Sequence, residues 1–167
     1  MLSAMRALRF RVDGRTLAMD LGWIHEICPL VRLKEVPGVP SWLAGLMDHH
    51  GQLVPVVDAS LLMGGPGVAQ VLGARLILVH GADHDAPDAR VATFALRVHA
   101  VEGVADLDRG ASWTTPGGLP GMPFLGEVTG DGAGSVHLLD PARLAALHAS
   151  LLQGPAVLAC SRGTVRP

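Results

Sequence analysis

The residues of this 167-residue chain that could do chemistry are mainly histidines and carboxylates, and they gather in two places. Asp48, His49 and His50 are consecutive, and a second group comprises His80, Asp83, His84, Asp85 and Asp88. Zinc sites need such ligands to converge from two rigid elements, whereas neighbouring strand residues point to opposite faces. We therefore predict no metal site and no cofactor, and interpret residues 80–88 as a solvated hairpin loop. A small metal-dependent enzyme that uses these histidines stays as an alternative.

The sequence lacks the usual motifs of nucleophilic catalysis. The sequence holds no Gly-x-Ser-x-Gly elbow and no glycine-rich loop that ends in Lys-Ser or Lys-Thr. The segment His25-Glu26-Ile27-Cys28-Pro29 resembles the start of a zinc-protease helix but lacks the second histidine. Cys28 and His25 could form a dyad, although a cysteine in an apolar β protein is usually a small buried hydrophobe. We predict no catalytic residue and no enzyme.

The composition of the chain limits the classes of partner that it can bind. The chain is 49% hydrophobic and 17% charged, which indicates a folded domain. A net charge of −2 argues against nucleic acid, because nucleic-acid binding requires a basic face. No apolar run approaches the roughly 18 residues of a membrane span, and the N-terminus lacks a signal-peptide core. We expect a cytoplasmic protein without direct membrane insertion.

Short alternating segments predict an all-β fold. Apolar residues alternate with polar ones before and after Asp13-Gly14, which is a strong hairpin signal because both turn residues tolerate positive φ. Glycine and proline separate these segments, as in a barrel or sandwich. Further strands are predicted at Gln52–Asp58, Arg75–Val79, Arg90–Val98 and Ser135–Leu139.

One helix is predicted near the C-terminus. Asp140 suits the N-cap, and Pro141 suits the first helical position, where its missing N–H is not needed. Leu144, Leu147 and Leu151 recur at helical spacing, and Gly154-Pro155 ends the run.

An internal repeat divides the chain into two related halves. Leu17–Leu21 with Ile24 and Ile27 matches Phe94–Val98 with Val101 and Val104 at one constant offset. Val54–Asp58 with Leu62 likewise matches Val136–Asp140 with Leu144. We predict a single domain over residues 6–152, with halves at about 7–62 and 74–144, and a tail at 153–167. Each half would be a barrel too small to be very stable alone, so the two should share a buried interface.

The stretch from Pro37 to Met47 is unusually apolar for a segment rich in glycine and proline. Trp42 and Leu43 are the best core candidates within it. An exposed remainder beside a strand edge would make a docking patch for a partner protein.

These motifs resemble the CheW family of chemotaxis coupling proteins over residues 6–150. The matching residues, in order, are Phe10, Val12, Asp13-Gly14, Leu17–Leu21, Ile24–Ile27, Val36–Pro40, Leu43-x-Gly45, Gly51-x-Leu53–Asp58 and Leu62-x-Gly64. The second half matches more loosely through Arg75–Val79, Leu96–Val104, Pro123–Gly126 and Val136–Asp140.

The resemblance implies an all-β fold with a few short helices: two pseudo-repeated five-stranded SH3-like barrels that share a core, and a C-terminal helix. It also implies a non-enzymatic adaptor, peripheral to receptor arrays, that binds the regulatory domain of a CheA-type histidine kinase and the cytoplasmic tip of chemoreceptors. The family's receptor groove maps onto part of the Arg75–Val79 strand and onto the candidate partner-binding residues Ile24, Glu26, Gly45, Asp48, His49, His50 and Gly51.

One departure from the family concerns this groove. The family commonly has Asn-Leu-Arg-Gly where this chain has Asp48-His49-His50-Gly51, so His50 stands at the arginine position. The change suits a divergent paralogue that serves its own pathway, such as surface sensing or twitching motility. It also permits a kinase-only regulatory scaffold of the same fold that has lost receptor binding.

Overall fold

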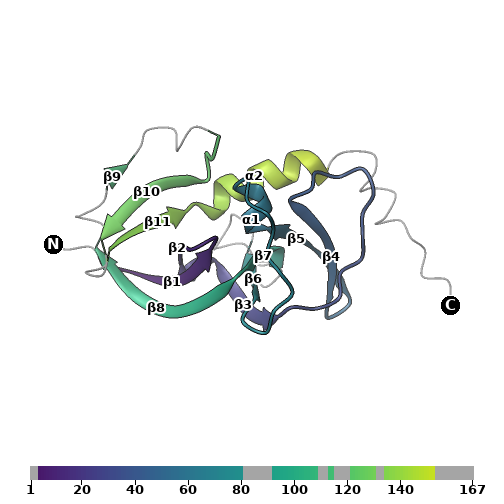
Figure 1. The fold of residues 1–167 in the computed structure, drawn as a ribbon, viewed down its shortest axis with the longest axis horizontal. Helices are drawn as coiled ribbons and strands as arrows, with labels where there is room; N and C mark the ends of the chain where they lie inside the picture. The colour runs from purple at the N-terminus through teal and green to yellow at the C-terminus, as the bar shows by residue number, and fades with distance from the viewer. Residues whose placement is uncertain (1–3, 81–91, 109–112, 115–120, 131–133, 153–167) are drawn as a thin grey trace.

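A computed structural model describes residues 4–80, 92–108, 113–114, 121–130 and 134–152 (Figure 1). The strands are β1 (Ala4–Val12), β2 (Arg15–Asp20), β3 (Ile24–Pro29), β4 (Leu43–His49), β5 (Gln52–Asp58), β6 (Arg75–His80), β7 (Ala92–Val98), β8 (Ala100–Asp108), β9 (Trp113–Thr114), β10 (Leu125–Gly130) and β11 (Ser135–Leu139). The helices are η1 (Leu21–Trp23), α1 (Ala59–Leu62) and α2 (Pro141–Leu152).

The strands form two sheets of equivalent design, which lie side by side in Figure 1. Sheet A has the order β8-β1-β2-β11-β10-β9, and sheet B has the order β3-β6-β7-β5-β4. Each contains an antiparallel hairpin (β1–β2 or β6–β7) whose second strand pairs in parallel with a strand of the other half of the sequence (β11 or β5). The all-β fold of two SH3-like units is therefore confirmed, and the short β9 is an addition to sheet A.

The two halves of the sequence exchange their first hairpins. Sheet A combines β1 and β2 of the first half with β8, β10 and β11 of the second, and sheet B combines β6 and β7 with β3, β4 and β5. The prediction that each half forms a barrel of its own is wrong. Neither unit is a closed barrel within the described residues, although an isolated bridge between Lys34 and Leu46 joins the segment after β3 to β4.

A shared core joins the two sheets, as the repeat predicts. It includes Phe10 and Leu17 from sheet A, Ile77 and Phe94 from sheet B, and Leu144 from α2, all less than 2% exposed. Alternate residues on β6 face a separate core inside sheet B, where Leu76 and Leu78 are buried. The central strands are consequently apolar on both faces.

The predicted helix and strands are confirmed where the structure describes them. The strand Gln52–Asp58 is β5, Ser135–Leu139 is β11, and Ala92–Val98 is β7. Asp140 caps α2 by accepting from the backbone N–H of Ala142 at 3.0 Å and of Arg143 at 3.2 Å. The tail and the stop at Gly154-Pro155 lie outside the described residues, as do Arg90 and most of the predicted 80–88 loop.

Most apolar residues of the stretch Pro37–Met47 belong to the core and are not available as a docking patch. Leu43, Leu46 and Met47 lie on β4 and are buried, and Trp42 packs against the shared core.

Candidate functional site

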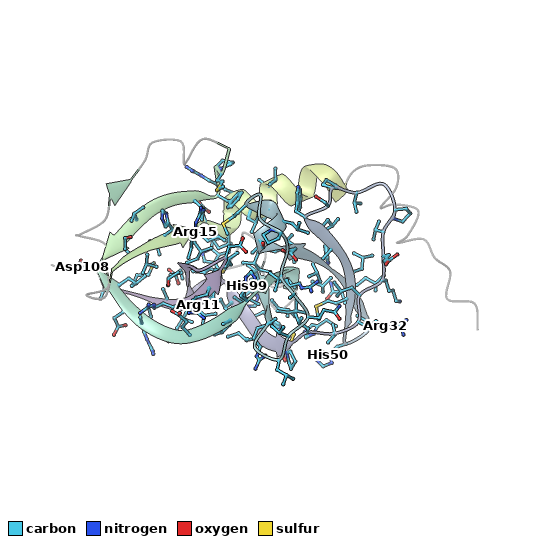
Figure 2. The ribbon with its side chains drawn as sticks, viewed as in Figure 1. Arg11, Arg15, Arg32, His50, His99 and Asp108 are labelled. Atoms are coloured by element: carbon cyan, nitrogen blue, oxygen red, sulfur yellow. The ribbon has the colours of Figure 1, made fainter. Side chains whose placement is uncertain are left out.

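The tight turn between β4 and β5 presents the histidine pair. His50 and Gly51 form its two central residues with φ values of 53° and 83°, both in the left-handed region. A two-residue turn of this kind matches the right-handed twist of the strands. Asp48 Oδ1 accepts from the Gly51 N–H at 2.8 Å, which stabilises the turn. His50 is exposed, and Figure 2 shows it at the lower edge of the molecule.

The edge strand β3 lies next to this turn. Glu26 is exposed on β3, and its Oε2 lies 3.5 Å from Nε2 of His49. Ile24 is half-buried and packs against the shared core, so only part of it is available to a partner. The structure thus brings Glu26, Asp48, His49, His50 and Gly51 together.

Gly45 differs from the other candidate partner-binding residues because it is buried. Its φ is +145°, and a Cβ built on it would lie 2.5 Å from the carbonyl oxygen of Lys34. The two backbones approach closely here because Leu46 and Lys34 exchange hydrogen bonds of 2.8 and 2.9 Å. Gly45 therefore serves the fold and offers no side chain to a partner.

Four histidines gather at this edge, and the sequence did not predict that His25 and His80 would lie beside the His49-His50 pair. The His25 ring lies 5.7 Å from the ring of His49 and 4.9 Å from the ring of His80, and both pairs are edge-to-face. The His49 ring lies 4.4 Å from that of His50. His84, Asp83, Asp85 and Asp88 lie outside the described residues. No sequence signal linked His25, His49 and His80, because they come from three different strands.

Two arrangements could suggest nucleophilic catalysis, and neither supports it. Burial and the nearby Glu26 carboxylate raise the pKa of the Cys28 thiol, which disfavours the thiolate that attacks substrates. Ser60 Oγ donates to Asp13 Oδ1 at 2.9 Å, while His99 Nε2 lies 3.7 Å from the same oxygen. Ser60 is fully buried, and its hydroxyl donates to the Asp13 carboxylate rather than to a histidine, so this trio lacks the serine–histidine contact that activates a nucleophile.

The Asp13 trio instead ties the two sheets together. The Asp13 N–H also donates to His99 Nδ1 at 3.3 Å, which joins the β1–β2 turn to the bend between β7 and β8. Figure 2 shows His99 in the middle of the molecule, where the sheets meet.

An apolar hollow of about 440 Å³ lies at the other end of β3. Leu72 is 97% exposed beside it, Val71 is 54% exposed, and Val31 is 42% exposed. The Arg75 guanidinium donates to the carbonyl oxygens of Leu72 and Ala74, so Leu72 lies on an ordered turn. We call the surface formed by Val31, Val71 and Leu72 the apolar patch. Exposed apolar residues around one hollow make this surface a candidate for contact with a protein partner.

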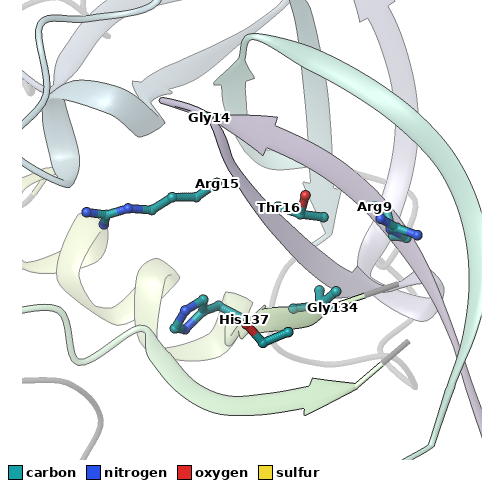
Figure 3. Close-up of a pocket in the computed structure, with 8 residues that line it drawn as sticks. Arg9, Gly14, Arg15, Thr16, Gly134 and His137 are labelled. Atoms are coloured by element: carbon teal, nitrogen blue, oxygen red, sulfur yellow. The ribbon is translucent and has the colours of Figure 1, made fainter. Parts of the chain in front are cut away.

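A second hollow, of about 330 Å³, lies on sheet A where β2 and β11 pair through only two residue pairs (Figure 3). Arg9, Arg15 and His137 line it with small polar residues. Arg9 is engaged with Glu102 at 3.3 Å. The described lining holds no carboxylate and no thiol and only one histidine, so it does not suit metal binding.

Comparisons with known proteins agree with this architecture. A family model described as the CheW-like domain matches residues 6–148. Protein PilI of Pseudomonas aeruginosa is 31% identical over 55 residues, which are 33% of this chain and 31% of that relative. The match thus spans about a third of PilI. The crystal structure of scaffolding protein TtCheW from Thermoanaerobacter tengcongensis has a TM-score of 0.70 and 18% identity, covering 81% of this chain and 88% of that one. At this identity the likeness establishes the fold. No helix among the described residues is long and apolar enough to span a membrane.

Proposed function

The chain belongs to the CheW-like domain family of scaffold and adaptor proteins, and from this premise we propose that it couples chemoreceptors to a CheA-type histidine kinase in a chemotaxis-like pathway. It would act in the cytoplasm, without catalysis, at the receptor tips. An adaptor needs two separate binding surfaces on one rigid body. The observation that carries the proposal is that sheet B offers two, at opposite ends of β3.

The two surfaces differ in chemistry. The apolar patch follows the C-terminal end of β3, while Glu26, Asp48, His49 and His50 form a polar edge near its N-terminal end. Six residues of extended chain place these ends about 17 Å apart. The two surfaces are therefore separate in position as well as in chemistry. We assign the apolar patch to the kinase regulatory domain and the polar edge to the receptor tip.

Replacing Leu72 with aspartate should weaken binding of the kinase regulatory domain at least about tenfold, because a fully exposed leucine at an interface centre acts as an apolar anchor. Calorimetry should give micromolar binding by the wild type over a contact of roughly 1,200–2,000 Å². Val104→Asp is the matched control, since Val104 is 50% exposed on β8 of the other sheet. Absence of heat and of co-elution at high micromolar wild-type concentration would argue against kinase coupling altogether.

Replacing His50 with alanine should weaken receptor-tip binding by about 1–2 kcal/mol, the scale of one interface hydrogen bond with its packing. His50→Arg should shift preference toward the partners of a standard coupling protein, because arginine stays charged and makes bidentate contacts. Titrations in buffer that contains a metal chelator compare the three proteins against cognate and non-cognate receptor tips. His137→Ala on sheet A is the control. Equal affinities of wild type and both variants would place His50 outside the interface.

Because His50 replaces the arginine that is common in the family, a second function is a kinase-only scaffold that has lost receptor binding. Separate pull-downs with the kinase regulatory domain and with the receptor tip distinguish the two. Capture by the kinase alone would replace the coupling proposal with the scaffold.

A further inference from the structure

A β-bulge in β3 changes which side chains lie together at the polar edge of sheet B. In the ladder with β6, Ile24 pairs with Val79 and Glu26 pairs with Leu78, so His25 is an extra residue. A bulge interrupts the alternation of side chains along a strand. In a regular strand His25 and Glu26 would point to opposite faces and could not share a metal ion, and the bulge removes this obstacle.

The opposite edge of the sheet supplies a third group. β3 and β4 are the two edge strands of sheet B, yet Glu26 of β3 lies 3.5 Å from His49 of β4, so the sheet curls and its two edges approach each other here. Hydrogen bonds between Lys34 and Leu46 hold β4 against the segment that follows β3. As a result one ligand atom from each of His25, Glu26 and His49 lies within 4.8 Å of the other two.

These three groups match the preferences of zinc. Two imidazoles and one carboxylate form a known three-ligand set that leaves a fourth position for water or a partner's ligand. Ligand atoms about 2.0–2.1 Å from a tetrahedral zinc are roughly 3.4 Å apart. Glu26 Oε2 and His49 Nε2 are already at 3.5 Å, so small side-chain rotations at His25 would complete the site.

Neighbouring histidines restrict the orientation of these ligands. The ring of His80, on β6, lies edge-to-face against the His25 ring at 4.9 Å, and the ring of His50 lies 4.4 Å from that of His49. Groups packed around a metal site orient its ligands and tune its affinity. The backbone around the site is held by β-sheet pairing on both edges.

We propose that His25, Glu26 and His49 bind one zinc ion that joins the two edges of sheet B. The ion links the bulge of β3 to the last residue of β4 and so makes the curl of the sheet more rigid. Because Glu26 and His49 also belong to the polar edge, zinc would set the shape of the surface offered to the receptor tip. That second consequence rests on the proposed function, whereas zinc binding itself does not.

The test uses the untagged full chain, stripped with a chelator and titrated with zinc in competition with a chromophoric chelator. The expected result is one zinc per chain with a dissociation constant in the micromolar range or below. At a hundredfold excess over that constant, the melting temperature should rise by roughly 5–10 °C. Cobalt in place of zinc should give the visible absorption of a tetrahedral site.

Variants locate the ion. His49→Ala and the isosteric Glu26→Gln should each weaken zinc binding at least about tenfold, since each removes one of three ligands. His137→Ala, on β11 of sheet A, is the control outside the three ligands and should bind zinc as the wild type does. Circular dichroism establishes that each variant is folded. If His49→Ala is not folded, the test rests on Glu26→Gln.

Two results would overturn the proposal: no stoichiometric zinc at 100 µM, or zinc binding that survives both His49→Ala and Glu26→Gln. Zinc binding is measured on the chain without partners, and the partner titrations made in chelator are repeated with zinc, so failure of the zinc site and failure of the coupling function remain distinguishable.

Discussion

Asp58→Ala should destabilise the protein by roughly 3–5 kcal/mol, the cost of breaking a buried charged network by removing one partner. The Asp58 side chain is 3% exposed, and its two oxygens accept from the N–H groups of Leu61 and Val68 at 3.0 Å each. Arg97 Nε lies 4.0 Å away, and its Nη2 donates to the Val68 carbonyl at 2.6 Å. Alanine would leave the two backbone donors without their acceptor and the Arg97 guanidinium without its counter-charge.

The internal repeat provides the matched control for Asp58. Asp140 occupies the equivalent position in the second half and caps α2 as Asp58 caps α1. Its side chain, however, is 43% exposed. Asp140→Ala should therefore cost only about 1 kcal/mol, as expected for a solvated N-cap. Urea denaturation of the three proteins measures both losses. Equal destabilisation by the two substitutions would show that burial of the Asp58 network contributes nothing beyond capping.

Gly45→Ala should destabilise the protein by roughly 2–5 kcal/mol, combining left-handed backbone strain with overpacking. The φ of +145° is unfavourable for any residue with a Cβ, and the added atom would lie 2.5 Å from the Lys34 carbonyl oxygen. That oxygen cannot retreat without breaking its hydrogen bond with Leu46. Loss of partner binding in this variant would follow from distortion of sheet B rather than from a lost contact.

Gly103→Ala separates the two contributions. Gly103 has a φ of +125°, yet no heavy atom lies within 4 Å of a Cβ built on it. This variant should show the backbone strain alone, roughly 1–3 kcal/mol. The thermal and urea midpoints of both variants give the comparison. A Gly45→Ala protein no less stable than Gly103→Ala would mean that the Lys34 segment moves aside freely.

Local patterns in the sequence predicted most elements because each depends on near neighbours. The Asp13-Gly14 turn has the expected left-handed conformation, with φ values of 50° and 74°. The edge strands β3 and β4 were less evident, because β4 lies in a segment rich in glycine and β3 is mostly polar or exposed. Their residues were placed through the family resemblance rather than through periodicity.

The repeat extends to features that the sequence pattern did not show. Both sheets carry a bulge at the same place of the repeat. In sheet A, Val101 pairs with Phe10 and Gly103 with Arg9, which leaves Glu102 as the extra residue. In sheet B, Ile24 pairs with Val79 and Glu26 with Leu78, which leaves His25. Glu102 pairs with Arg9 and Arg11. Equivalent backbones thus present different chemistry in the two units.

The sequence by itself determined the all-β class, the strands with clear alternation, the capped C-terminal helix and the existence of two related halves. Only the tertiary structure decided which hairpin joins which half. Equivalent hairpins carry the same apolar pattern, so pairing within a half and pairing between halves look alike in sequence. The histidine cluster also depended on the tertiary structure. The ligand atoms of His25, Glu26 and His49 come together only through a bulge in β3 and the curl of sheet B. Both features arise from long-range packing and not from local alternation.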